Sequence, residues 1–492
     1  GMVHENDAAE RLAALCGREN MTWSETKEGK IELKSAIEGV FLVDSARLFA
    51  VNSIDELMIA TRRGGGTVHP GDKLAGPRVI PLIIRVPIAV ALGFSALVIV
   101  WGWDMGIGMI SYNFFAGVAK FPLLAIPFFI LAGYIMERAG IAARIIELME
   151  ALVGDKTGGL AVASVAVCTF WGAVSGSGPA TVAALGLGLI PGMVKAGYDK
   201  AFASSAVAVT SGIAIVIPPS IAFIVYGGIT DVSVPALFAG GFIPGLVVAG
   251  FILAAVVIIS KKRGYHGVRR TKPMLQILKE SFWGAMTPVV ILGGIYGGIF
   301  TPTEAAAIAV FYGLFVGIFI YKTINSVKML FEIFAQSMRA TAIVMIVVTC
   351  AGLFSWVAST VGLIEKGSSL FLSLSSSPVV IMLMINIILL FAGMLLDAIS
   401  IYYVFLPFML PIIANFGWDP LWFGIVMTVN LAIGQVTPPV AVNLYVAAHI
   451  SNLTMEEISK SSLPLILAAI LALVVIILFP GLTTFLPNLL GL

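Results

Sequence analysis

Charged side chains, cysteines and nucleotide-binding loops are all scarce in this sequence. Charged residues make up 11% of the 492 positions and hydrophobic residues 59%, which excludes a soluble protein from about residue 86 onward and predicts a polytopic helical membrane protein. The three cysteines, Cys16, Cys168 and Cys350, are scattered, which argues against a disulfide framework or a metal knuckle. No GxxxxGK motif occurs, so ATP-driven pumping by this chain is unsupported. No charged-then-apolar leader is visible, and the net charge of +2 gives no reason to expect a nucleic-acid partner.

Two parts of the chain carry the same helix-breaking and turn-forming residues. Six residues of the first part recur 220 positions later (411 − 191 = 220) without a gap. Six such matches at one spacing predict an internal duplication. The matched pairs are Pro191 and Pro411, Gly197 and Gly417, Asp199 and Asp419, Pro218 and Pro438, Pro219 and Pro439, and Pro244 and Pro464.

Each copy is predicted to contain a re-entrant hairpin followed by a broken helix. Hairpins are expected at 159–193 and 379–413, where polar or small residues interrupt apolar runs. Broken helices are expected at 201–226 and 421–445, because proline removes a backbone donor and forces its predecessor out of the helical region. The predicted domains are a soluble segment at 1–84, a first membrane helix with its connector at 85–120, repeat 1 at 121–262, a basic loop with scaffold helices at 263–340, and repeat 2 at 341–492 with a last helix at 464–479.

The loop from Lys261 to Lys272 orients the chain in the membrane. Its sequence, KKRGYHGVRRTK, holds six basic residues and no acidic one, which places it in the cytoplasm by the positive-inside rule. Four spans separate the broken helices, plus a hairpin that adds none or two, so the repeats are expected to be inverted. The same count places the N-terminus in the cytoplasm and the C-terminus in the periplasm. The predicted fold class is an all-α polytopic membrane protein with two inverted repeats, preceded by a small soluble α+β or β-rich fragment.

Discontinuous helices that meet near the midplane are typical of secondary transporters, because unpaired backbone is tolerated there without lipid contact. Opened carbonyls can replace the water shell of a sodium ion, and half-helix N-termini attract a carboxylate. The first copy offers the hydroxyls of Ser175 and Ser177 and the carbonyls around Ala214, Ile217 and Pro219. The second offers Thr437 and the carbonyls around Gly393, Gly434 and Val440. The candidate substrate-binding residues are Ser175, Ser177, Pro179, Thr181, Ser220, Asp397, Thr437 and Asn443.

Each of these features also has a purely structural interpretation. The Ser-Gly-Ser-Gly run at 175–178 could be a close-packing face, and each double proline could only kink a helix. Asp397 could be a buried carboxylate satisfied by neighbouring hydroxyls, although an acid inside a membrane is a functional candidate by default. Asn443 could line a pathway or simply pack. The recurrence of the breaks at one spacing favours the functional interpretation.

Residues 1–84 have an ordinary charge density, unlike the rest of the chain. The stretch from Asn52 to Ile84 resembles the C-terminal part of molybdopterin-binding proteins related to the molybdenum-cofactor biosynthesis family. The likeness covers most of residues 1–84 and implies a fragment, because the upstream part of that family is missing. Two interpretations stay open, an inactive passenger segment or a working cofactor domain.

Six further motifs occur in order along the membrane part. They are FPLLAIPFFILAGYIM at 121–136, SGSGPAT at 175–181, IPPSIAFIVYG at 217–227, LFAGGFIPG at 237–245, GGIFTPTEAAA at 297–307 and GQVTPPVAVN at 434–443. Together they resemble the large membrane subunit of tripartite ATP-independent periplasmic (TRAP) transporters. The likeness runs from about residue 86 to the end.

This resemblance implies sodium-driven uptake of a small organic acid, such as a carboxylate, dicarboxylate or sugar acid, across the bacterial cytoplasmic membrane. It implies a periplasmic substrate-binding protein, a small four-span membrane subunit and an elevator-like moving domain, with Na⁺ as coupling ion and no organic cofactor. No enzyme activity is expected. It assigns one sodium site to Ser175, Ser177, Ala214, Ile217 and Pro219, and another to Gly393, Gly434, Thr437 and Val440. Two alternatives remain: a divalent-anion sodium symporter that works without a binding protein, and a membrane-anchored molybdopterin-handling enzyme.

Overall fold

The computed structural model describes residues 21–25, 30–35, 39–44, 87–267 and 272–492. The chain divides into two compact units, Gly1–Pro87 and Ile88–Leu492. Most of the segment that resembles molybdopterin-binding proteins lies outside the described residues, as do Arg269 and Arg270 of the basic loop. The interpretation of that segment therefore stays a prediction.

The described part of the first unit is a three-stranded antiparallel sheet in the order β1-β2-β3. Its strands are β1 (Met21–Glu25), β2 (Lys30–Ser35) and β3 (Gly39–Asp44). In the sequence of β2, the apolar residues Ile31 and Leu33 alternate with charged ones, which is the period-two pattern of a strand. The register places Leu33 opposite Trp23 of β1 and Phe41 of β3.

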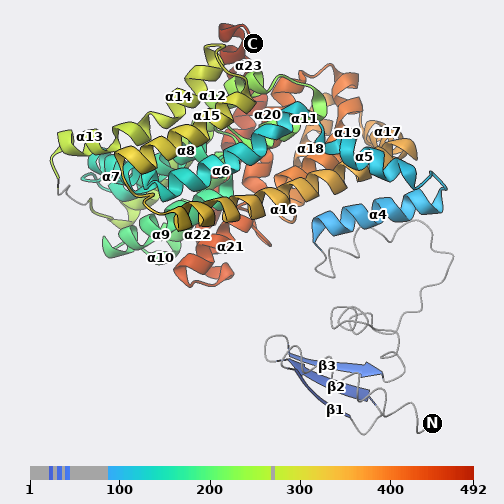
Figure 1. The fold of residues 1–492 in the computed structure, drawn as a ribbon, viewed down its shortest axis with the longest axis horizontal. Helices are drawn as coiled ribbons and strands as arrows, with labels where there is room; N and C mark the ends of the chain where they lie inside the picture. The colour runs from blue at the N-terminus through green and yellow to red at the C-terminus, as the bar shows by residue number, and fades with distance from the viewer. Residues whose placement is uncertain (1–20, 26–29, 36–38, 45–86, 268–271) are drawn as a thin grey trace. The chain divides into compact units, whose positions relative to one another are not determined.

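Every described regular element of the second unit is a helix (Figure 1). Before the first hairpin lie α4 (Ile88–Gly102), α5 (Gly108–Val118), the 3₁₀ helix η2 (Phe121–Leu124), α6 (Ala125–Arg138) and α7 (Ile141–Val153). Between Arg263 and the second hairpin lie α13 (Met274–Ala285), α14 (Thr287–Tyr296), α15 (Pro302–Phe315), the π-helix η4 (Val316–Ile320), α16 (Val327–Thr360) and α17 (Leu363–Leu374).

The two copies have matching helices. The first consists of α8 (Gly159–Ser175), α9 (Gly178–Lys195), α10 (Lys200–Ser211), the 3₁₀ helix η3 (Gly212–Ile215), α11 (Ile221–Thr230) and α12 (Val234–Arg263). The second consists of α18 (Pro378–Gly393), α19 (Ala398–Phe416), α20 (Pro420–Gly434), α21 (Val442–Ser451) and α22 (Met455–Leu478), followed by α23 (Gly481–Leu490). The starts of α9 and α19 differ by 220 (398 − 178), and so do those of α10 and α20 (420 − 200).

Local conformation repeats together with the helices. Gly197 and Gly417, which precede α10 and α20, both have a positive φ, 88° and 64°. The carboxylates of Asp199 and Asp419 then accept hydrogen bonds from the backbone N–H groups of the helices that follow, at 2.9 Å and 2.8 Å, as helix caps do. Each double proline lies between two helices instead of inside one, as the sequence predicts.

Within the scaffold region predicted at 263–340, α13 ends at Ala285 and α14 begins at Thr287. Pro288 lies at the start of α14, where its missing N–H and fixed φ favour a new helix over a continued one. The short helices α5, α17 and α23 were not expected. Among the described residues, seven helices are long and apolar enough to cross a membrane.

The core lies where the copies interlock. Helix α10 packs against α8 and α9 of its own copy and also against α21 and α22 of the other, and α12 packs against both α20 and α22. Every residue of α10 from Phe202 to Ser211 is buried, and so is every residue of α20 from Trp422 to Gly434. The first double-proline break, Pro218-Pro219, is therefore buried between both copies, whereas at the second break Pro438 is half-buried and Pro439 is exposed.

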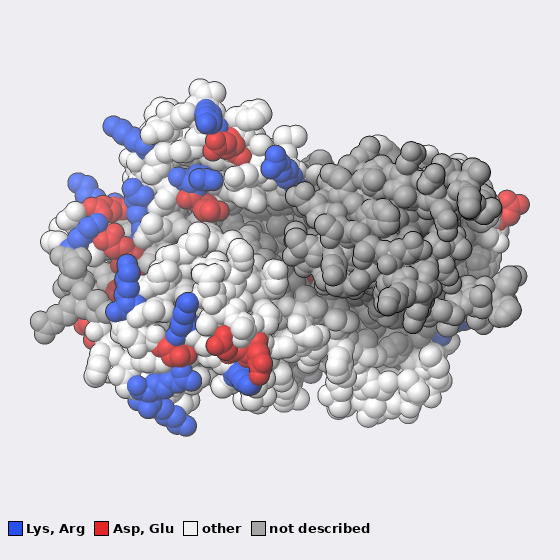
Figure 2. Space-filling model, turned by 90° about the horizontal axis from the view of Figure 1, so that it is seen from below, with Lys and Arg blue, Asp and Glu red and all other residues white. Residues whose placement is uncertain are grey.

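Charged side chains gather at one end of the second unit. Figure 2 shows many basic and acidic residues on the left, where Figure 1 places α7, α9, α10 and α13. The exposed basic residues of these elements and of the end of α12 include Lys156, Lys195, Lys200, Lys261 and Lys262. Lys272 also contacts Glu147 at 2.9 Å and Glu280 at 3.1 Å.

Candidate functional site

The first hairpin turns at Ser175, Gly176 and Ser177, between α8 and α9. Gly176 has a φ of 62°, in the left-handed region that glycine adopts without strain. The Ser175 hydroxyl is buried and donates to the carbonyl of Ser177 at 3.3 Å. The Thr181 hydroxyl donates to the same carbonyl at 2.8 Å. Ser177 precedes α9 in extended conformation, but its side chain makes no capping hydrogen bond, so its hydroxyl stays available.

This turn lies directly against the first double-proline break. A β-carbon on Gly176 would lie 2.8 Å from the carbonyl oxygen of Pro219, so only glycine admits the contact. No hydrogen bond from a described residue reaches the carbonyls of Ile217 and Pro219. A β-carbon on Gly172 of α8 would lie 2.9 Å from Cα of Ala214. The structure therefore brings all five residues predicted for the first sodium site to one turn and one break.

The donor set at this break suits sodium. Two hydroxyls and several main-chain carbonyls, with no nitrogen ligand predicted, are the oxygen ligands that a hard cation prefers. The free carbonyls of Ile217 and Pro219 are acceptors without donors, and buried acceptors of this kind cost free energy unless something binds them. Ser220 has a different role, because its hydroxyl donates to the Ile215 carbonyl and accepts from the Phe223 N–H, which caps α11.

The second hairpin differs at its turn. Asp397 is the cap of α19, accepting from the N–H groups of Ile399 at 3.0 Å and Ser400 at 3.2 Å and from the Ser400 hydroxyl. Both carboxylate oxygens are thus satisfied within the first turn of their own helix. Of the two interpretations left open by the sequence, the hydrogen bonds match the carboxylate satisfied by its neighbours.

The second break brings its predicted residues into contact through backbone. A β-carbon on Gly434 would lie 2.7 Å from Cα of Gly393, so α18 and α20 meet at these two glycines. The Thr437 hydroxyl donates to the Ile433 carbonyl at 2.6 Å, which leaves its lone pairs free to accept or to bind a cation. Val440 is 44% exposed, the most open of the four residues predicted for the second sodium site.

The first hairpin also contacts the second break, where Gly178 lies against Gln435 and Asn443. Sequence reasoning missed Gln435. A β-carbon on Gly178 would lie 2.9 Å from both Gln435 Oε1 and Asn443 Oδ1. Both amide oxygens are buried without a hydrogen-bond partner, while Asn443 Nδ2 donates to the Ala208 carbonyl at 3.4 Å. The signal for Gln435 was its place beside the double proline in an apolar stretch. Pro179 and Thr181 lie in the first turn of α9, beside this contact.

Two of the cavities that adjoin the copies differ in whether predicted residues line them. A cavity of about 200 Å³ lies between α6, α16 and the first turn, and both Ser175 and Ser177 line it. A larger cavity of about 550 Å³ lies between α18, α20 and α22 and contains none of the predicted residues. Its walls are mostly apolar apart from Asn386, Asn430 and two tryptophans. Because Ser175 and Ser177 line the smaller cavity, it is the better candidate for the functional site.

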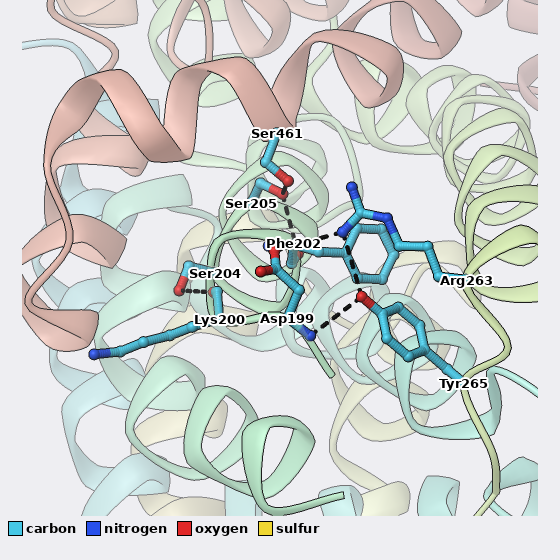
Figure 3. Close-up of polar contacts among 8 residues, drawn as sticks. All are labelled: Asp199, Lys200, Phe202, Ser204, Ser205, Arg263, Tyr265 and Ser461. Atoms are coloured by element: carbon cyan, nitrogen blue, oxygen red, sulfur yellow. Dashed lines mark hydrogen bonds and ion pairs between the residues drawn. The ribbon is translucent and has the colours of Figure 1, made fainter. Parts of the chain in front are cut away.

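A polar cluster at the charged end holds helices together and contains no predicted site residue. Figure 3 shows Asp199, Arg263 and Tyr265 converging at the start of α10, with Tyr265 accepting from the Asp199 N–H at 3.1 Å and from Arg263 at 3.3 Å. Arg263 lies 3.5 Å from the Asp199 carboxylate. Beside α13, the pKa of Glu280 is lowered by a hydrogen bond from Gln276 and by the ammonium group of Lys272.

These features define a multi-pass membrane transport protein, in which two interlocked copies each place a helical hairpin against a broken helix. Residues 79–482 match the family described as "Tripartite ATP-independent periplasmic transporter, DctM component". The chain belongs to this family. It is thus the multi-pass inner-membrane component of a transporter, and its relatives are permeases, not enzymes.

Two curated relatives illustrate the match. The chain is 39% identical over 422 residues to the isethionate TRAP transporter permease protein DctMQ of Oleidesulfovibrio alaskensis, covering 85% of this chain and 66% of the relative. It thus spans just under two thirds of that relative's length. It is 37% identical over 437 residues to the C4-dicarboxylate TRAP transporter large permease protein DctM of Vibrio cholerae, covering 83% of this chain and 95% of the relative.

A solved structure shares the fold. The antimetabolite efflux pump MtrF of Neisseria gonorrhoeae superposes with a TM-score of 0.57 over 83% of this chain and 96% of its own, at 15% identity. At that identity the likeness concerns architecture alone. The comparisons support the permease resemblance and give no support to the molybdopterin-like resemblance of residues 1–84.

Proposed function

We propose that this chain is the large permease subunit of a carrier that couples inward sodium flow to import of a small organic anion. The observation that supports it most directly is the first break, where free main-chain carbonyls face a hairpin turn with two hydroxyls. The named relatives transport isethionate and C4-dicarboxylates, both small organic anions. A periplasmic binding protein and a small four-span subunit are part of the proposal.

The two copies supply two sodium sites in this scheme. Ser175, Ser177 and the carbonyls of Ala214, Ile217 and Pro219 would hold one ion, and Thr437 with the carbonyls of Gly393, Gly434 and Val440 would hold the other. Each ion would replace part of its water shell with protein oxygens. The carbonyls of Ile217 and Pro219 accept no hydrogen bond from a described residue, while the Gly434 carbonyl accepts one from the Thr437 N–H at 3.0 Å and would bind the ion through its second lone pair. The ions would thereby fasten each hairpin to its broken helix.

The organic anion is placed at the N-terminus of α9. The first N–H groups of a helix have no intrahelical acceptor, and the helix dipole favours negative charge there. No side chain caps α9, whereas α19 already has the carboxylate of Asp397 at the equivalent position. The unpartnered amide oxygens of Gln435 and Asn443, beside Gly178, are acceptors for hydrogen-bond donors of the same solute.

Alternating access would move the hairpins and broken helices together against the remaining helices, in an elevator-like motion. The inverted arrangement of the two copies, with the N-terminus in the cytoplasm and the C-terminus in the periplasm, belongs to the proposal. It is supported by the basic loop after α12 and by the exposed lysines at the same end of the molecule.

The test is sodium-dependent uptake of radiolabelled succinate or isethionate into proteoliposomes that contain the full chain with its partner proteins. The double variant S175A/S177A and the single variant T437A are expected to raise the sodium concentration needed for half-maximal uptake. S164A is the matched control, because the Ser164 hydroxyl bonds the Ala161 carbonyl farther back on α8. Half-saturation equal to that of S164A in both variants would refute the two sodium sites.

A further inference from the structure

The cavity of about 200 Å³ beside the first turn has an oxygen-rich lining. Its polar residues are Tyr134 and Glu137 from α6, and Ser175 and Ser177 from the first hairpin. Apolar and small side chains, including Ile130, Trp171 and Val344, form the other walls. No basic side chain lines it, so the cavity combines one carboxylate, one phenol and two hydroxyls.

The Glu137 carboxylate forms no hydrogen bond or ion pair with a described residue. Arg138, the next residue along the chain, acts on it electrostatically but does not line the cavity. Three other carboxylates in the second unit have a structural role as helix caps. Glu304 and Glu457 complete capping boxes, and Asp397 caps α19. A structural explanation of this kind does not apply to Glu137.

The position of Glu137 on its helix also disfavours a structural role. It lies in the last turn of α6, which ends at Arg138, and the C-terminal end of a helix dipole repels negative charge. A carboxylate that lines the same cavity as candidate ion ligands is itself a candidate for the ion path. A hard cation fits this lining, because it prefers oxygen ligands, while an organic anion would be repelled by the carboxylate.

We propose that this cavity is a sodium vestibule, in which Glu137 attracts the ion that Ser175 and Ser177 bind and draws it along its path when it leaves them. The inference rests on the proposed sodium coupling and adds a residue and a path to it. It also separates the two solutes, because the anion must reach α9 from outside this cavity. In the proposed orientation, Glu137 lies at the cytoplasmic end of α6, where the vestibule would serve sodium release.

Sodium alone is the first probe, with no substrate present. The melting temperature of the purified full chain is measured in increasing NaCl against KCl at constant ionic strength, because a bound ion stabilises the folded state in proportion to its occupancy. For E137Q, the sodium concentration that gives half of the stabilisation is expected to rise about fivefold, the effect of a unit charge across roughly 8 Å at an intermediate dielectric constant. E137D keeps the charge and is expected to restore most of the response.

E150Q is the matched control, because Glu150 lies on α7 and does not line the cavity. An E137Q response equal to that of E150Q would overturn the vestibule while leaving sodium coupling intact. No sodium-specific stabilisation of the wild type would instead refute sodium coupling, and the vestibule with it. Anion half-saturation is then measured by counterflow with equal and saturating sodium on both sides. Because saturating sodium cancels the weaker sodium affinity, anion half-saturation should match the wild type in E137Q, and a tighter anion half-saturation with an unchanged sodium response would assign the cavity to the anion.

Discussion

Gly176 allows the sharpest test of the first sodium site. An alanine there would adopt a φ of 62°, which costs an L-residue about 1–2 kcal/mol. Its β-carbon would also lie 2.8 Å from the Pro219 carbonyl oxygen, closer than such atoms approach in real proteins. The carbonyl must therefore move by a few tenths of an ångström, away from the turn that offers Ser175 and Ser177.

The chain contains a matched control for the backbone strain. Gly417 has nearly the same φ, 64°, and a β-carbon there would meet no heavy atom within 4 Å. G417A therefore introduces only the strain of a left-handed backbone conformation. G176A introduces the same strain and also displaces a proposed sodium ligand, so the difference in sodium half-saturation between the two variants measures the effect of the contact with Pro219.

The expected results differ in stability and in sodium response. Both variants should melt at a lower temperature than the wild type, G176A more so. Only G176A should require a higher sodium concentration for half-maximal uptake, by about tenfold if one ligand oxygen is worth about 1.4 kcal/mol. If G176A and G417A have the same sodium half-saturation, the Pro219 carbonyl is not a ligand and the reasoning about the first break is wrong.

Two further predictions concern other parts of the chain. D397A is expected to lower the free energy of unfolding by about 1 kcal/mol because α19 loses its cap, while D397N keeps the cap and stays close to the wild type; a melting curve of D397N as low as that of D397A would show that the charge matters beyond capping. A chain without residues 1–84 is expected to keep the sodium half-saturation of the full chain in proteoliposomes, and loss of sodium-dependent uptake despite normal insertion would contradict the passenger interpretation.

The elements that could be predicted from the sequence are those set by local chemistry. The breaks at Pro218-Pro219 and Pro438-Pro439 follow from a missing donor and a steric clash, which do not depend on distant contacts. The helix starts after Asp199 and Asp419 follow from a carboxylate that accepts backbone N–H groups within its own turn. For the same reason, the turn at Ser175–Ser177 was recognisable from its glycines and hydroxyls.

The parts that could not be predicted depend on how separate helices pack. Nothing near Gln435 in the sequence shows that its amide oxygen meets Gly178, 257 positions earlier (435 − 178 = 257), because that contact requires the two copies to interlock. Glu137 likewise resembles an ordinary charge at a helix end until the fold shows that it lines the same cavity as Ser175 and Ser177. The role of Asp397 stayed open because a sequence does not show which way a carboxylate points.

The comparison of Ser177 with Asp397 shows how the copies have diverged. The two residues are 220 positions apart and each precedes the second helix of its hairpin, so the backbone geometry is shared. At Asp397 the helix N-terminus is neutralised by its own carboxylate, whereas at Ser177 it is left without a side-chain cap. Since an unneutralised N-terminus attracts anions, one hairpin retains the capacity to bind a carboxylate while the other gains stability in its place. In the proposed scheme the duplicated backbone would provide two cation sites, and this single side-chain difference would decide which helix N-terminus faces the anion.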